Sequence, residues 1–177
     1  FLDHVETTAQ KIGAINTIVA EKGELTGYNT DATGALRALK MGGVALTGKR
    51  IVVLGSGGAA RAIAFALAAE SGAGKLTLLG IEDVERTRLA QDIRSTTAVT
   101  VEDSYLDEST LRRVLPAAHI LIHCTPVGMS PKAEVTCVPA SLLHPDLVVM
   151  DIVYNPHETR LLKDAGLAGC KTISGLD

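Results

Sequence analysis

Apolar and polar residues alternate in blocks along most of the chain, and from residue 49 onward the blocks repeat as strand and helix. Short aliphatic runs bounded by turn residues are typical of buried strands, and apolar residues at a helical period are typical of helices. This alternation predicts an α/β fold, a Rossmann-like and mostly parallel sheet with helices on both faces. The expected strands are 50–54, 75–79, 98–102, 119–124, 147–151 and 170–173, and the expected helices are 58–70, 83–94, 108–114 and 157–165.

The first part of the chain follows a different pattern. Residues 3–12 predict the end of a helix that stops at a glycine. Two short strands at 14–20 and 25–29 flank a polar turn and predict a hairpin. A helix at 31–41 follows and ends at a glycine pair. We therefore expect a small leading piece, residues 1–30, and a dinucleotide-binding domain, residues 31–177.

A glycine-rich turn follows the first strand of the predicted parallel sheet. The strand runs into Gly55-Ser56-Gly57-Gly58-Ala59, and an alanine-rich helix follows. Such a turn lets main-chain N–H groups approach a pyrophosphate, and the helix dipole favours its negative charge. Since strand, turn and helix stand in the required order, the motif predicts a dinucleotide site. The alternative is an ordinary strand–helix turn that binds no ligand.

Two carboxylates follow the second strand of this sheet, at Glu82 and Asp83. In a Rossmann-like fold, an acidic side chain at this place accepts from the ribose 2′-OH of NAD, and a basic one accommodates the 2′-phosphate of NADP. Asp83 is also a favoured residue for capping the next helix. We expect Glu82 to accept a hydrogen bond from the ribose, which favours NAD over NADP, and Asp83 to cap the helix.

The composition of the chain limits the kinds of partner that it is expected to bind. The chain has 177 residues, 46% of them hydrophobic, and a formal net charge of −3. A nucleic-acid partner needs a basic patch, so none is expected. The longest apolar run, 62–69, is far shorter than the ~20 residues that cross a bilayer, so no membrane partner is expected either.

The cysteines and histidines lack metal-ligand spacing, so no metal site is expected. Three cysteines without a Cys-x-x-Cys pair are typical of reduced thiols in a cytoplasmic protein. His123 ends an apolar run, which predicts a core or strand-end histidine rather than a ligand. No basic stretch precedes an apolar run at the start, so no signal peptide is expected. Because the chain begins with Phe1 and not with Met, we expect it to begin inside a longer protein.

Five sequence motifs occur in a fixed order along the chain. They are Ile12-Gly13-Ala14-Ile15-Asn16-Thr17-Ile18, Gly27-Tyr28-Asn29-Thr30-Asp31-Ala32-Thr33-Gly34, the glycine turn through Arg61, Cys124-Thr125-Pro126-Val127-Gly128-Met129 and Asp151-Ile152-Val153-Tyr154-Asn155-Pro156. Together these motifs resemble the shikimate dehydrogenase family, which includes the quinate/shikimate dehydrogenases, and Gly175-Leu176-Asp177 resembles the start of the family's Gly-Leu-x-Met stretch.

The resemblance implies reversible hydride transfer between NADP or NAD and shikimate or 3-dehydroshikimate, in a cleft between two domains. Residues 1–30 would then be the remnant of the N-terminal substrate domain, and the partner would be a small molecule of the shikimate or quinate type. A homo-oligomer is compatible with the sequence.

The resemblance also implies roles for single residues. Asp31 matches the catalytic aspartate, which sits against a lysine and holds the substrate hydroxyl; Asn16 and Tyr154 match further substrate ligands. Without the resemblance, these three residues would be a helix N-cap, a strand-end amide and a packing tyrosine. The positions that match the nicotinamide side are Thr125, Val127, Ile152 and Gly175.

The chain departs from the family in three ways. The family's catalytic lysine, carboxylate-binding serines and C-terminal glutamine have no counterpart here, so we expect these 177 residues alone to be inactive. Gly80-Ile81-Glu82 and Glu85 stand where NADP-dependent members carry Asn-Arg-Thr and a further Arg, which favours NAD or dual use. His123-Cys124 replaces the family's common Asn-Ala, a change without a functional interpretation from sequence alone.

Two other function classes remain open. A non-catalytic ligand-sensing module of the same fold would have no need to retain Asp31, Asn16 and Tyr154. A related two-domain dehydrogenase for a folate or an amino-acid derivative would not carry the Asn29-Thr30-Asp31 motif.

Overall fold

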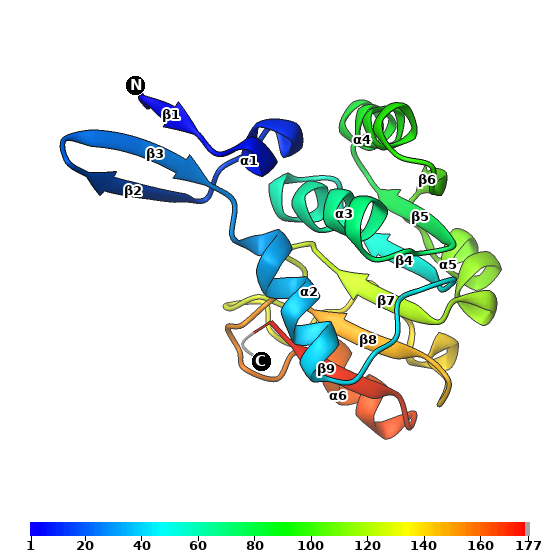
Figure 1. Ribbon diagram of the computed structural model, residues 1–177. Helices are drawn as coiled ribbons and strands as arrows, with labels where there is room; N and C mark the ends of the chain where they lie inside the picture. The colour runs from blue at the N-terminus through cyan, green and yellow to red at the C-terminus, as the bar shows by residue number, and fades with distance from the viewer. Residues whose placement is uncertain (176–177) are drawn as a thin grey trace.

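The computed structural model describes residues 1–175, and its larger part is built on one parallel sheet (Figure 1). The strand order is β6-β5-β4-β7-β8-β9, and every neighbouring pair is parallel. The order reverses between β4 and β7, which is the place where ligands bind in open α/β sheets. The six strands are β4 (Arg50–Leu54), β5 (Lys75–Gly80), β6 (Thr100–Tyr105), β7 (Ile120–His123), β8 (Val148–Asp151) and β9 (Lys171–Ser174).

Two aliphatic cores cover the two faces of this sheet. Ile51 and Val53 of β4 point into the core beneath α2, α3 and α4, whereas Val52 and Leu54 point into the core beneath α5 and α6. The two-residue alternation of β4 therefore supplies both cores. The helices are α2 (Asp31–Met41), α3 (Gly58–Glu70), α4 (Asp83–Thr96), α5 (Glu108–Val114) and α6 (Arg160–Leu167), with 3-10 turns η1 (Leu115–Ala117) and η2 (Ala140–Leu142).

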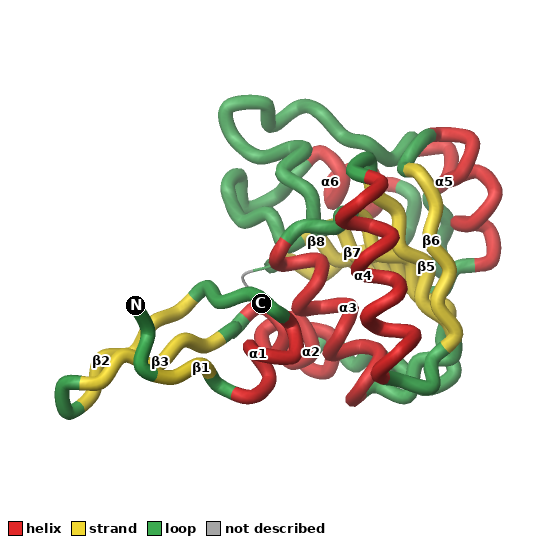
Figure 2. Tube along the Cα trace, turned by 90° about the horizontal axis from the view of Figure 1, so that it is seen from above, coloured by secondary structure: helices red, strands yellow, loops and turns green. Residues whose placement is uncertain are grey.

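A second, three-stranded sheet lies before α2 and extends away from the larger part (Figure 2). Its strands β1 (His4–Val5), β2 (Thr17–Glu21) and β3 (Glu24–Tyr28) have the order β1-β3-β2. The tight turn between β2 and β3 holds Lys22 at φ 52° and Gly23 at φ 88°, as a two-residue hairpin turn requires. Helix α1 (Thr7–Ile12) follows β1 and contacts α3.

The fold predicted from the sequence is confirmed: a parallel sheet with helices on both faces follows a short hairpin. The predicted helix end at Gly13 is confirmed, but the helix begins only at Thr7, because His4 and Val5 pair with β3. Glu6 caps that helix by accepting from the amides of Thr8 and Ala9.

Three elements are displaced by three residues at one end from their expected bounds, and the first of them, β2, begins at Thr17 rather than at residue 14. β6 runs over Thr100–Tyr105 because it is an edge strand, where polar residues such as Asp103 can pair with β5. α6 begins at Arg160 because the Thr159 hydroxyl caps it by accepting from Leu162 N.

Within residues 1–175, no helix combines the length and the apolar character needed to cross a membrane. The same residues contain no group of three or more His, Cys, Asp or Glu side chains placed to hold a metal ion.

Candidate functional site

The glycine turn joins the carboxyl end of β4 to the N-terminus of α3. Gly55 has φ 111°, and a Cβ there would lie 2.7 Å from the Cys124 carbonyl oxygen, so only glycine allows β4 and β7 to meet here. Gly57 is the N-cap of α3, and a Cβ at this position would meet no atom within 4 Å. The surface above the first turn of α3 is therefore open, and the amides of that turn lack intrahelical partners.

A groove of about 310 Å³ lies above this turn. The α1 end forms its opposite wall, and the Arg61 side chain ties that wall to α3 by donating to the Ile12 carbonyl and pairing with Asp92 at 2.6 Å. Open backbone amides at the N-terminus of a helix, next to cationic side chains, fit a pyrophosphate. The groove is lined by Gly13, Ala14, Ser56, Gly57, Gly58, Arg61, Glu85 and Arg88.

The turn after β5 lies beside the glycine turn, since a Cβ on Gly80 would lie 3.0 Å from Ser56 Oγ. Glu82 is exposed and occupies the N-cap position of α4, with no capping bond from its side chain. The prediction that Asp83 caps this helix was wrong. Asp83 is the first helical residue, and its carboxylate pairs instead with Arg86 at 2.7 Å.

Asp31 and Asn16 form one hydrogen-bonded unit at the start of α2. Asn16 Nδ2 donates to Asp31 Oδ1 at 2.7 Å, and Asn16 Oδ1 accepts from Thr30 N at 3.0 Å. The Asn29 side chain accepts from the Asp31 amide at 3.1 Å. Asp31 is therefore no helix cap: Thr30 holds the N-cap position, and the carboxylate is turned toward the hairpin.

Asp31 faces the ends of β8 and β9 across a cavity of about 420 Å³. Ile152, Tyr154 and Gly175 line this cavity together with Asp31. A second cavity of about 310 Å³ shares Ile152 and Tyr154 and is lined also by Cys124 and Thr125. The structure thus brings most of the predicted substrate and nicotinamide residues to one place.

The Cys124 thiol, next to Thr125, lies within the electrostatic influence of Asp31. Burial raises the pKa of the Cys124 thiol, and the carboxylates of Asp151 and Asp31 raise it further. Asp31 thus acts on the end of β7, although it belongs to α2.

Two predicted residues, Asn16 and Val127, do not line these cavities, whereas Gly175 lines the cavity that Asp31 faces. Asn16 reaches them only through Asp31, and Val127 lines a neighbouring hollow with Pro126 and Val135. Gly175 packs so closely on β8 that a Cβ there would lie 2.7 Å from the Ile152 carbonyl oxygen. The Leu176 and Asp177 of its motif lie outside the described residues.

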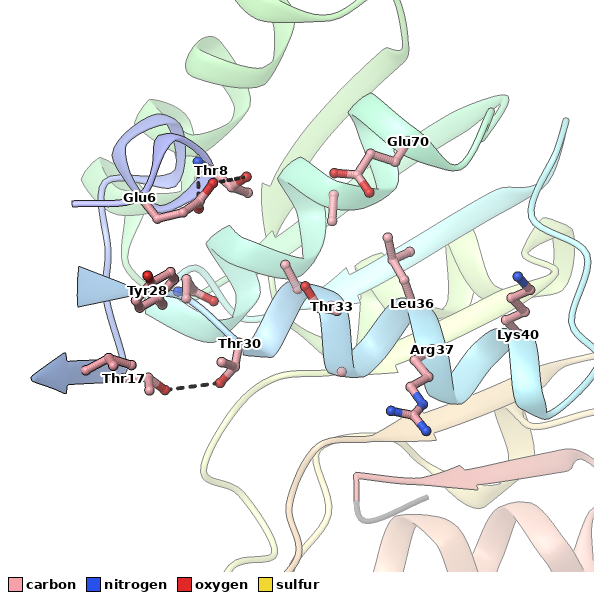
Figure 3. A pocket seen from close by; sticks show the side chains of 15 residues that line it. Glu6, Thr8, Thr17, Tyr28, Thr30, Thr33, Leu36, Arg37, Lys40 and Glu70 are labelled. Atoms are coloured by element: carbon pink, nitrogen blue, oxygen red, sulfur yellow. Dashed lines mark hydrogen bonds between the residues drawn. The ribbon is translucent and has the colours of Figure 1, made fainter. Parts of the chain in front are cut away.

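A larger hollow of about 920 Å³ lies between the hairpin and the exposed faces of α2 and α3. Figure 3 shows its polar rim, where the Thr17 and Thr30 hydroxyls lie 3.3 Å apart and Glu6 contacts Thr8. None of the residues predicted for catalysis or cofactor binding lines it.

The prediction of a core or strand-end histidine is confirmed for His123, which is buried and ends β7, but the polar network that it forms with Asp151 and Thr125 was not predicted. His123 Nδ1 lies 2.9 Å from Asp151 Oδ1, and His123 Nε2 lies 2.5 Å from Thr125 Oγ1. Burial lowers the pKa of His123, but the hydrogen bond and charge of Asp151 outweigh it and, with Cys137, raise the pKa to about 9. A signal was present in the sequence, because both residues end apolar runs that become neighbouring strands.

No family model matches the chain, but individual known proteins are similar to it over most of its length. It is 47% identical over 169 residues to a shikimate dehydrogenase (NADP(+)) of Methanosarcina barkeri, covering 95% of this chain and 59% of the relative. It is 43% identical to a quinate/shikimate dehydrogenase of Shigella flexneri, covering 99% of this chain and 72% of the relative.

The similarity extends to solved structures. Shikimate 5-dehydrogenase from Listeria monocytogenes, in complex with shikimate and NAD, superposes with a TM-score of 0.88 at 37% identity. The match covers 99% of this chain and 62% of that one. The chain therefore spans about 60% of the length of the shikimate dehydrogenases it matches.

Proposed function

Because the chain belongs to the shikimate dehydrogenase family, which includes the quinate/shikimate dehydrogenases, we propose that it carries the dinucleotide-binding part of such an enzyme. The reaction is the NAD(P)-dependent interconversion of shikimate and 3-dehydroshikimate. Residues 31–177 form the dinucleotide domain, and residues 1–30 belong to the substrate domain. One observation carries this proposal: the open glycine turn, where the strand order reverses, and the Asp31 carboxylate lie on the same edge of the sheet.

Residues of the glycine turn hold the pyrophosphate. The turn runs from Gly55 to Ala59 and includes Ser56, and its open surface above Gly57 admits a phosphate to the free amides of α3. A bound nicotinamide dinucleotide supplies or accepts the hydride. The residues of this chain that line its nicotinamide end are Thr125, Val127, Ile152 and Gly175.

Glu82 sets the choice between NAD and NADP. The side chain is exposed beside the glycine turn, where a carboxylate can accept from a ribose hydroxyl and repels a 2′-phosphate. We therefore propose use of NAD, or of both dinucleotides, although the Methanosarcina relative is named for NADP.

Asp31 orients the reacting hydroxyl of the substrate. The Asn16 amide fixes one carboxylate oxygen of Asp31 and leaves the other for the substrate or for the family's lysine. Ketone reduction needs a proton donor at the oxygen, and a lysine held by this carboxylate supplies it. Tyr154 reaches the same cavity from the end of β8. Since that lysine has no counterpart in these 177 residues, we propose that they bind dinucleotide without turnover.

The test uses the protein that the gene encodes in full, with shikimate and quinate as separate substrates and each dinucleotide in turn. We expect reduction of the dinucleotide and a fall in kcat of about 100-fold or more for Asp31→Asn, with dinucleotide affinity unchanged. No turnover with either substrate would refute the function. An Asp31→Asn enzyme as active as the wild type would refute the role of Asp31, and turnover by residues 1–177 alone would refute the role of the lysine.

A further inference from the structure

We propose that His123 sets the direction of the Thr125 hydroxyl, so that Thr125 donates a hydrogen bond to the nicotinamide carboxamide only while His123 is protonated. His123 is thus a positioning residue that acts through Thr125. The inference rests on the proposed function, because it requires a nicotinamide in the cavity that Thr125 lines.

The network runs in one line from the start of α6 to the loop after β7. Asp151 Oδ2 accepts from Thr159 Oγ1 at 2.6 Å, and Asp151 Oδ1 accepts from Val153 N at 3.0 Å and faces His123 Nδ1 at 2.9 Å. Asp151 is fully buried, His123 is 2% exposed and Thr159 is 1% exposed. Thr125 is half-buried and stands at the outer end of this line, where the cavity begins.

The Asp151 carboxylate fixes the tautomer of the ring. A carboxylate only accepts hydrogen bonds, so His123 Nδ1 carries a proton in both the neutral and the cationic form. The proton gained or lost on titration is therefore the one on Nε2, the nitrogen that faces Thr125 Oγ1 at 2.5 Å.

This assignment decides what the Thr125 hydroxyl does. Its oxygen already accepts from Val127 N at 3.2 Å. While His123 is cationic, Nε2–H also donates to this oxygen, and the hydroxyl proton points along the one remaining direction as a donor. Once His123 is neutral, Nε2 becomes an acceptor and draws the hydroxyl proton inward, so the cavity loses its donor.

The surroundings of the ring hold the cationic form at neutral pH. From β8 the ring faces Asp151, and from the loop before η2 it faces the half-buried thiol of Cys137; both raise the pKa of His123 against the opposing effect of burial. The β4 residue in register with His123 is Leu54, which carries no charge. Among the described residues, these contacts therefore keep His123 protonated at neutral pH, and the ring loses its Nε2 proton only at higher pH.

Two measurements on the chain test the proposal. In ¹⁵N NMR of the ring nitrogens, assigned with His123→Asn, we expect both nitrogens of His123 to be protonated at pH 7 and only Nδ1 above about pH 9. The dissociation constant of NADH, measured by fluorescence, is expected to rise about fivefold to tenfold between pH 8 and 10, as loss of one hydrogen bond implies.

Four variants separate this explanation from others. His123→Asn and Thr125→Val should abolish the pH dependence, and Thr125→Ser should retain it because it keeps the hydroxyl. Cys137→Ser should also retain it, since the thiol is not the switching group. A neutral His123 ring at pH 7, or an unchanged pH profile in Thr125→Val, would overturn the proposal. If NADH failed to bind at every pH, the proposed function would fall, and with it the ligand-directed part of this inference.

Discussion

Substitution of Gly55 by alanine tests whether the glycine turn is held by close contact between β4 and β7. The new methyl group would lie 2.7 Å from the Cys124 carbonyl oxygen, 3.1 Å from its carbon and 3.3 Å from Thr125 Cγ2. The residue also has φ 111°, a conformation that an L side chain rarely adopts. Both strain and clash therefore act on a buried part of the backbone.

The expected loss of stability combines the cost of the strained φ with the cost of relieving the clash. A residue held at such a φ costs about 1–3 kcal/mol. Relief of the clash also stretches the hydrogen bonds from Gly55 N to Leu79 O, 2.7 Å, and from Cys124 N to Leu54 O, 2.8 Å, each worth about 1 kcal/mol. We expect Gly55→Ala to lower the free energy of unfolding by about 3 kcal/mol.

Urea denaturation followed by circular dichroism measures this loss. With a slope of about 2 kcal/mol/M, the midpoint should fall by about 1.5 M. Gly57→Ala is the matched control, because its φ of −72° suits alanine and its Cβ meets nothing within 4 Å. The control should cost less than about 1 kcal/mol yet weaken dinucleotide binding. A loss below about 0.5 kcal/mol for Gly55→Ala would refute the reasoning.

Other predictions concern single side chains. Glu82→Arg should raise the ratio of NADP to NAD affinity by about tenfold or more in paired titrations; an unchanged ratio would show that Glu82 does not touch the ribose. Arg86→Met should cost about 1–3 kcal/mol in urea denaturation, because the Asp103 carboxylate loses one of its two arginine partners and the Gly80 carbonyl loses one of its two donors; a change within 0.5 kcal/mol would contradict this. The pair of His123 and Asp151 should stabilise the fold fully below pH 6.5 and lose its contribution as the pH rises through about 9, because the folded chain retains a proton that the unfolded chain has released. The loss should be on the order of 3 kcal/mol and absent in His123→Asn, and an identical pH profile of the unfolding midpoint in the two proteins would exclude it.

The sheet and its ligand edge could be predicted because they depend on local patterns. An apolar run that enters the glycine turn at Gly55 specifies strand, turn and helix within a dozen or so residues, and the strands then align by a general rule of chain connection. The bounds of α3 therefore agreed with the sequence, and so did those of β4.

Features that depend on distant contacts could not be predicted. His4 and Val5 form a strand only because β3 lies beside them. Glu82 and not Asp83 holds the cap position of α4, and Asp83 pairs with Arg86, which Asp103 of β6 also contacts. The apolar runs that end at His123 and Asp151 do not by themselves show that the two residues meet, because that depends on the register of β7 against β8.

The most direct test of the account is a crystal structure of the protein with a bound nicotinamide dinucleotide. We expect the pyrophosphate within hydrogen-bond distance of the first amides of α3 above Gly57, and the nicotinamide between Thr125 and Ile152 with its reacting face toward Asp31. A pyrophosphate bound away from this turn, or a nicotinamide whose reacting face points away from Asp31, would contradict the account.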